Sequence, residues 1–363
     1  MQARRKPLTA LAIAAALAAA PLHGQVQTPQ LSPAGALQLL ETYLESLRQQ
    51  SGIPGMSAAV VRDGEVVWDR GFGYQNVASR VHATPDTPYL AGDLSGALAS
   101  TLVLQCVEQR RLELDAPIKR YDLAQPDPEA TVRQLLSHAA PQGAAETFIY
   151  NPDRYATLTA VMEWCAPQPY RKSVAHRILN RLAMTDSVPG TDLSDPRLEL
   201  PETLFTADDL DGYRRVLERM ALPYKLDSRK RPERTDVPSM PVTASNGLVS
   251  TVRDLAKLDA ALDTRLLLMD DTLAAAWTPA QDRDGAAMPM GLGWFVQNYR
   301  GVRLVWHFGY VANGYSSLWL KVPERNVTFI LMANSDGLSA PFQLSAGDVT
   351  RSLFATVFLK LIL

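Results

Sequence analysis

The chain has 363 residues, of which 47% are hydrophobic and 20% are charged, and its formal net charge is -2 at neutral pH. This length and composition are enough for one large core or two ordinary ones without disulfide or metal cross-links. The absence of a strong positive charge argues against nucleic acid as a partner.

The start of the chain has the pattern of a secretory signal peptide. Three basic residues precede an apolar run over residues 8–20, which is shorter than a membrane span requires. We therefore expect residues 1–24 to be a cleaved signal peptide and residues 25–35 to be a short leader. The mature protein would then be periplasmic or secreted, with no stable membrane span. An uncleaved membrane anchor is the alternative.

The next segments alternate between strand and helix patterns. Helical spacing over residues 37–52 predicts a helix that ends at a glycine. Two β-branched runs flank Asp63 and Gly64, which predicts a hairpin. Residues 95–221 have mostly helical patterns, and the polar, proline-rich residues 223–242 are predicted to form a loop.

The last third begins with a helix and then changes to a strand pattern. Ser250 or Thr251 is expected to cap the helix, with Asp254 as the acid of a capping box. Four strand candidates over residues 291–334 then predict an antiparallel meander. An apolar-faced helix over residues 349–363 closes the chain.

Strands at both ends of the chain with helices between them predict a divided domain. We expect residues 36–94 and 243–363 to form one α/β domain and residues 95–242 to form an inserted, mainly helical domain.

Cysteines and histidines give little sign of a cross-link or a metal. Cys106 and Cys165 lie in helix-like segments, so buried thiols are expected, although the sequence leaves a bridge open. His138 is expected to pack or cap at a helix end, and His82 and His176 to lie on the surface. No metal-ligand motif occurs, so no metal and no cofactor are expected.

Five segments occur in an order that resembles a known family. They are "IPGMSAAVVRDGEVVWDRGFGYQN", "DTPYLAGDLSGALASTLVLQCVEQRRLELDAPI", "TVRQLLSHAA", "SNGLVSTVRDLAKL" and "HFGYVANGYSSLWLKVPERNVTFILMANSDG". Together they resemble the serine β-lactamase and penicillin-binding-protein family, especially its class C and esterase-like branch, over about residues 53–334. The resemblance implies a β-lactamase/transpeptidase-like α/β fold, with an antiparallel sheet flanked by helices and an inserted all-helical domain.

The first family motif is Ser-x-x-Lys, which supplies the nucleophile and its base. In "YLAGDLSGALAS" the serine position holds Asp93 and the lysine position holds Gly96. No serine in the chain has a lysine three residues later, and no G-x-S-x-G segment occurs.

The second and third motifs are partly kept. Tyr150 matches the tyrosine of Tyr-x-Asn, but Pro152 stands where the asparagine is expected; a one-residue slip would bring in Asn151. His307 and Gly309 match the Lys/His-x-Gly motif. The resemblance then implies that the N–H of the next residue, Tyr310, is an oxyanion donor.

The replacement of the motif serine and lysine by Asp93 and Gly96 changes what the site can do in acyl transfer. Asp93 offers no hydroxyl for acylation, and at a helix start it is expected to act as an N-cap and to stay ionised. Gly96 is a poor helix residue, so it either opens space or marks a relaxed constraint. Ser95 lies about 200° round a helix from Asp93 and is expected to face away from it.

The leading functional hypothesis is therefore an exported β-lactamase-related pseudoenzyme that has lost serine acyl transfer. It would bind a small molecule or a cell-wall peptide fragment without a covalent bond, through Asp93, Tyr150, His307 and Tyr310. The alternative is an active serine-hydrolase-type enzyme, namely a β-lactamase, D-Ala peptidase or esterase, with an altered mechanism. In that case Asp93, Tyr150 and His307 could do acid–base work. A third possibility is a purely structural or regulatory protein without a ligand.

Overall fold

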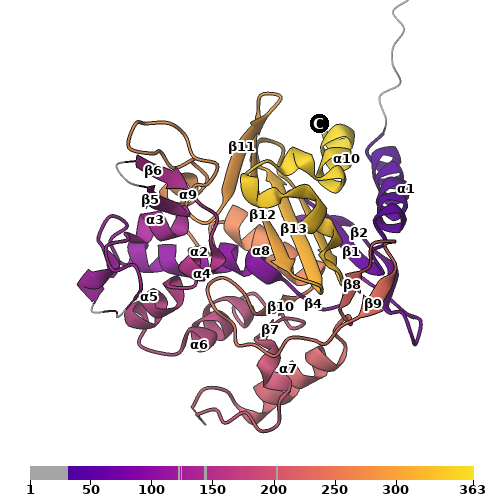
Figure 1. The fold of residues 1–363 in the computed structure, drawn as a ribbon, viewed down its shortest axis with the longest axis horizontal. Helices are drawn as coiled ribbons and strands as arrows, with labels where there is room; N and C mark the ends of the chain where they lie inside the picture. Colours follow the sequence, from indigo (N-terminus) through magenta and orange to yellow (C-terminus); the bar gives the residue numbers. More distant parts are fainter. Residues whose placement is uncertain (1–31, 122, 124, 143–144, 202) are drawn as a thin grey trace, which may run out of the picture.

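The computed structural model describes residues 32–363 except positions 122, 124, 143–144 and 202. The expected signal peptide and most of the leader lie outside the described residues. A seven-stranded antiparallel sheet occupies the centre, in the order β11-β12-β13-β14-β1-β2-β3 (Figure 1). Its strands are β1 (Gly55–Arg62), β2 (Glu65–Asn76), β3 (Val81–His82), β11 (Phe295–Tyr299), β12 (Val302–Val311), β13 (Tyr315–Val322) and β14 (Val327–Ala333). Because β14 pairs with β1, the two ends of the chain share one sheet.

The predicted hairpin and meander are both confirmed. Asp63 and Gly64 have φ angles of 52° and 81° and connect β1 to β2, as a tight hairpin turn requires. The strands β11 to β14 follow one another in chain order across the sheet. The fold is therefore the β-lactamase/transpeptidase-like α/β fold that the segment order implied.

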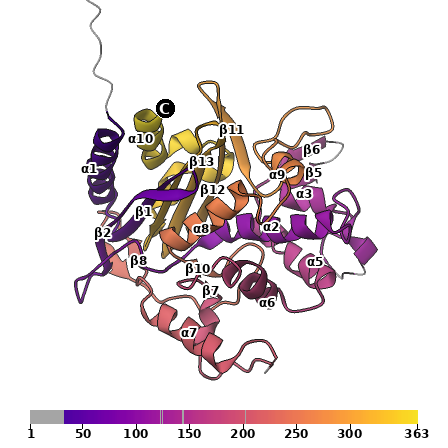
Figure 2. The same cartoon turned by 180° about the vertical axis from the view of Figure 1, so that it is seen from behind.

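Side chains that alternate along the strands build a core on each face of the sheet. Leu304, Trp306 and Phe308 face the helices α1 (Pro33–Ser51) and α10 (Leu353–Ile362). The opposite face of the sheet packs against α2 (Ser95–Glu108) and α8 (Val252–Asp263), through residues such as Val305, Trp319 and Ile330 (Figure 2). His307 lies between Trp306 and Phe308 and so shares the face of α2.

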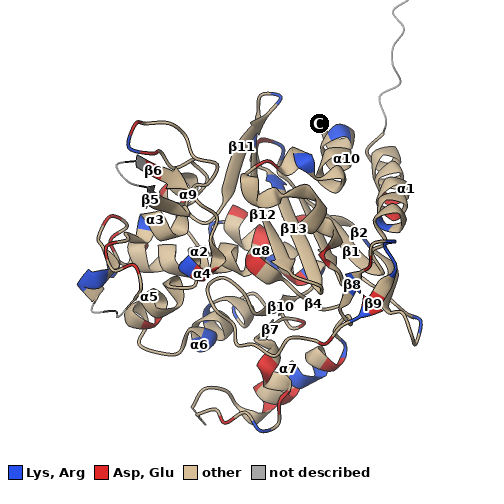
Figure 3. Cartoon of the chain, viewed as in Figure 1, with Lys and Arg blue, Asp and Glu red and all other residues tan. Residues whose placement is uncertain are grey.

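Smaller elements surround these layers. The helices are α3 (Val132–Leu136), α4 (Pro152–Tyr155), α5 (Leu158–Cys165), α6 (Tyr170–Val174) with a π-helical turn (Ala175–Leu179), α7 (Ala207–Glu218) and α9 (Asp270–Ala276). The short strands β4 (Tyr89–Leu90), β10 (Leu248–Ser250) and β7 (Val188–Pro189) form a second sheet, and β5 (Ala139–Gln142) with β6 (Ala145–Phe148) and β8 (Tyr224–Leu226) with β9 (Pro232–Arg234) form two hairpins. Charges of both signs are spread over the fold, including both on α7 (Figure 3). The division into two domains stays a prediction.

The expected capping of α8 is half right. Thr251 is the N-cap, and its side chain accepts from the N–H of Asp254. The capping-box role of Asp254 is wrong, because its carboxylate accepts from Ser187 and pairs with Lys257 at 2.7 Å. Asp254 thus connects α8 to the segment before β7.

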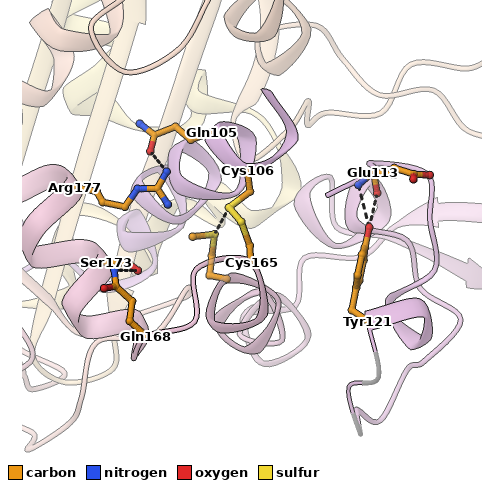
Figure 4. Close-up of a disulfide and its surroundings, with 9 residues drawn as sticks. Gln105, Cys106, Glu113, Tyr121, Cys165, Gln168, Ser173 and Arg177 are labelled. Carbon is orange, nitrogen blue, oxygen red and sulfur yellow. Dashed lines mark hydrogen bonds between the residues drawn. A yellow bond between two sulfur atoms is a disulfide. The ribbon is translucent and has the colours of Figure 1, made fainter. Parts of the chain in front are cut away.

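The expectation of two buried free thiols is wrong. Cys106 and Cys165 form a disulfide that ties α2 to α5 across a separation of 59 residues (Figure 4). The sequence could not place the two helices against each other, which is why it left the bridge open.

Among the described residues, no helix is long and apolar enough to cross a membrane. The same part of the chain holds no group of three potential metal-ligating side chains.

Candidate functional site

Asp93 lies in the turn that leads directly into α2. A 3-10 helix, η1 (Gly92–Leu94), precedes the α-helix without a break, so Asp93 sits inside a helical turn and is only 8% exposed. The N-cap of α2 is Leu94, which makes no side-chain capping bond. The expected N-cap role of Asp93 is therefore wrong.

Two glycines allow β12 to approach this turn closely. Gly92 has a φ of 63°, and a Cβ on it would lie 2.7 Å from the backbone nitrogen of Tyr310. A Cβ on Gly309 would lie 1.8 Å from the carbonyl oxygen of Ala91. The glycine of the third motif is thus required for packing between η1 and the strand, and it places the Tyr310 backbone beside η1.

The environment of the Asp93 carboxyl favours its protonated form. Burial raises its pKa to about 7, an interaction with the Tyr150 hydroxyl lowers it in part, and the charge of Asp153 raises it further. No described lysine or arginine forms an ion pair with Asp93 or is among the groups that shift its pKa. The expectation that Asp93 stays fully ionised at neutral pH is wrong, because burial outweighs the helix N-terminus.

The space beside Gly96 is filled by two rings. A Cβ on Gly96 would lie 3.3 Å from Nε2 of His307 and 3.4 Å from Cε1 of Tyr155. The hydroxyl of Tyr155 donates to the carbonyl oxygen of Gly96 at 2.9 Å. A Cβ at position 96 would therefore be tight against the His307 ring and in ordinary contact with Tyr155, so Gly96 leaves little open space.

His307 is buried and neutral. It is 1% exposed, and burial lowers its pKa to about 4. Its Nδ1 lies 2.8 Å from the carbonyl oxygen of Phe308, so the ring proton is assigned to Nδ1, which donates to this carbonyl. Nε2, the acceptor nitrogen, then faces Gly96.

Tyr150 belongs to a stack of rings that the sequence did not reveal. The His138 ring stacks on Tyr150 at 4.5 Å and on Tyr155 at 4.9 Å. Burial lowers the pKa of His138 to about 3, and its Nδ1 accepts from the N–H of Asn151 at 3.0 Å. No local signal marked Tyr155 or His138, since their role depends on packing between α3, α4 and α2.

The remaining candidates take structural positions. Asn151 caps α4 with its side-chain oxygen and Pro152 is the first residue of that helix, so in the slipped alignment the amide oxygen is already engaged. Ser95 is 1% exposed, and its hydroxyl donates to the carbonyl oxygen of Gly92 at 2.8 Å. Both side-chain oxygens thus have a structural role.

Tyr310 forms the exposed part of the site. Its side chain is 38% exposed, and its pKa is raised by partial burial and by the charges of Asp336 and Asp93. We call Asp93, Tyr150, His307 and Tyr310 the Asp93 site. It combines an unneutralised carboxyl, two phenols and a neutral imidazole, and two further carboxylates, Asp153 and Asp336, act on it.

A family model and a curated protein that match this chain are both described as β-lactamase or β-lactamase-like. A family model described as Beta-lactamase matches residues 40–348. The human mitochondrial serine beta-lactamase-like protein LACTB is 30% identical over 128 residues, which is 33% of this chain and 23% of that protein. This chain thus matches less than a quarter of the length of that relative.

Two solved structures share the fold at low identity. The octameric penicillin-binding protein homologue from Pyrococcus abyssi has a TM-score of 0.71 and 22% identity, covering 89% of this chain and 77% of its own. D-amino acid amidase from Ochrobactrum anthropi SV3, solved with L-phenylalanine amide, has a TM-score of 0.67 and 19% identity. The match covers 90% of this chain and 98% of the amidase chain.

Proposed function

The chain belongs to the Beta-lactamase family, and from this premise we propose that the Asp93 site binds a small amine-bearing amide without forming a serine acyl-enzyme. The observation that carries the proposal is the buried Asp93 carboxyl, which has no cationic partner among the described residues. A ligand ammonium would supply that partner, and the exposed ring of Tyr310 favours a cation.

The charges around the site support an amine as the recognised group. Asp153 acts on Asp93, and Asp336 acts on Tyr310, so the field at the site is negative. The solved complex of the amidase with L-phenylalanine amide motivates the choice of an amino acid amide as the probe. A cell-wall peptide fragment with a free amino group has the same chemistry.

The residues present argue against a serine acyl-enzyme. Asp93 has no hydroxyl, Ser95 is hydrogen-bonded to Gly92, and the family's lysine position holds Gly96, which has no amine and lies beside the rings of His307 and Tyr155. Loss of both nucleophile and base removes several powers of ten in acyl-transfer rate.

Hydrolysis without a serine is the second candidate, and the family membership favours it. In this mechanism the ionised Asp93 takes a proton from a water whose oxygen attacks the amide carbon. The C–N bond then breaks, and the amine leaves with that proton. The backbone N–H of Tyr310 is the donor for the oxyanion in this scheme.

One experiment separates the two candidates. The purified protein is titrated calorimetrically with D- and L-phenylalanine amide, and the same mixtures are assayed for free phenylalanine. We expect saturable binding without release, and loss of binding in Asp93→Asn. Release that Asp93→Asn abolishes would establish hydrolysis instead. A covalent adduct with a fluorescent penicillin in the intact mass would contradict both.

Export stays part of the proposal. The disulfide between Cys106 and Cys165 supports an oxidising compartment such as the periplasm or the cell exterior. Fractionation of the producing cells, with the mass of the mature chain, tests it: a full-length reduced chain in the cytosol would contradict it.

A further inference from the structure

A polar pocket lies at the opposite end of α2 from the Asp93 site. It has a volume of about 480 Å³ and is lined by Gln105, Glu108, Gln109, His176, Arg177, Arg181, Leu267 and Met269. We call it the arginine pocket. The 14 residues of α2 separate it from Asp93 by about 20 Å, at about 1.5 Å per residue.

The arginines of this pocket are held in place by neutral groups. Nη2 of Arg177 donates to Oε1 of Gln105 at 2.8 Å, and Figure 4 shows the two side chains pointing toward each other next to the disulfide. Nη2 of Arg181 donates to the carbonyl oxygen of Leu266 at 2.8 Å. In the described part of the chain, neither arginine forms an ion pair with a carboxylate, so both keep further N–H donors for a ligand.

Positive charges outnumber negative ones in this pocket. Burial lowers the pKa of Arg177, and the nearby charges of Arg111 and Arg181 lower it further. The imidazole of His176 also lines the pocket. Glu108 is the one carboxylate in the lining, and its oxygen is engaged by the backbone N–H of Met269 at 2.7 Å. The pocket therefore keeps a net positive charge.

The backbone of this region is unusual as well. Arg177 lies in the π-helical turn Ala175–Leu179 that continues α6. Such turns are rare and occur often at functional sites. Here the turn places His176 and Arg177 in the lining of one pocket with Arg181.

We propose that the arginine pocket binds a soluble phosphate-type oxyanion at a site distinct from the Asp93 site. Guanidinium groups pair with phosphate oxygens in a bidentate geometry, and a pocket on the surface between α2 and the π-helical turn admits a compact, multiply charged anion. The proposal does not rest on the function of the Asp93 site.

The test uses inorganic pyrophosphate as the probe and calorimetry at low salt. We expect saturable binding that weakens about tenfold in Arg181→Gln, because a charge-assisted contact is removed, and weakens further when Arg111→Gln removes a second positive charge near Arg177. Arg181 and Arg111 are exposed, so these variants should fold. Arg325→Gln, an exposed arginine on another part of the chain, is the matched control and should bind like the wild type.

Three results would overturn the proposal. They are the absence of saturable heat up to about 10 mM pyrophosphate, equal binding by wild type and the double variant, and equal weakening in the Arg325→Gln control. A fourth arm adds vesicles of phosphatidylglycerol. Capture by vesicles that the double variant loses, together with no saturable binding of pyrophosphate, would assign the pocket to a lipid headgroup and contradict a soluble ligand.

Discussion

Two buried aspartates of this fold, Asp259 and Asp93, have opposite surroundings. Asp259 on α8 accepts from Nζ of Lys321 at 3.0 and 3.1 Å and from Nε1 of Trp319 at 3.0 Å. Asp93 has an interaction with the Tyr150 hydroxyl and no cation among the described residues. Both are at most 8% exposed, so the difference lies in their partners.

The difference separates a structural carboxylate from a candidate binding group. Burial lowers the pKa of Lys321, but Asp259 and Asp263 more than offset this, so its net pKa is raised and the cluster stays charged. Asp93 has no such compensation, and its pKa rises to about 7. A buried acid that costs stability and has no cationic partner is a functional candidate.

The largest expected effect comes from removing the partner of Asp259. Lys321→Met leaves a buried carboxylate without a cation and should lower the free energy of unfolding by about 3–5 kcal/mol. Urea denaturation measures it. The double variant Lys321→Met with Asp259→Leu should recover most of the lost stability. If the single variant Lys321→Met is as stable as the wild type, Asp259 does not depend on its cation and does not differ from Asp93 in this way.

The reverse effect is expected at Asp93. Because its pKa in the folded state lies above the unfolded value, stability falls as the pH rises from about 4 to about 7, and the full cost of the buried carboxylate is reached above about pH 7. Asp93→Asn should therefore add up to about 4 kcal/mol to the free energy of unfolding at pH 8 and nothing at pH 4. Asp284→Asn, at an exposed position, is the control. A gain independent of pH would contradict the assignment.

Binding of an amine should depend on the same proton. The ammonium prefers the ionised carboxylate, so affinity for phenylalanine amide should rise almost tenfold per pH unit below about pH 7 and fall again above about pH 8, where the α-amino group of the ligand loses its proton. Calorimetry from pH 5 to pH 8 measures this. Affinity that is flat across the range would show that Asp93 does not face the amine.

The smallest effect is expected at Tyr150. Its hydroxyl lowers the pKa of Asp93 in part, so Tyr150→Phe should raise that pKa by about one unit or less. The acid limb of the pH profile of amine affinity should shift upward by the same amount. A shift to lower pH would contradict the contact.

The long elements were predictable because their signals are local. The hairpin at Asp63 and the strands β11 to β14 have alternating patterns with turn residues between them. The hairpins β5–β6 and β8–β9 were missed, since strands of three or four residues are too short to show a period.

The family motifs predicted which residues lie at the site but not how those residues are buried, protonated or packed. The family motifs located Asp93, Gly96, Tyr150 and His307, and the structure brings these four together. Their roles stay predictions. The burial of Asp93 depends on residues more than 50 positions away in the chain, so its local sequence suggested an ordinary N-cap. For the same reason, nothing in the local sequence indicated that Tyr155 packs against Gly96.

Asp93 is a buried carboxyl without a cationic partner among the described residues, and we propose that the ammonium group of a ligand supplies that partner. The most direct test is a carboxyl-carbon NMR titration of labelled aspartate, assigned with Asp93→Asn, without and with saturating phenylalanine amide. We predict a pKa of about 7 in the free protein and a clear fall on binding. A pKa near the ordinary aspartate value in the free protein, or one that the ligand leaves unchanged, would contradict the account.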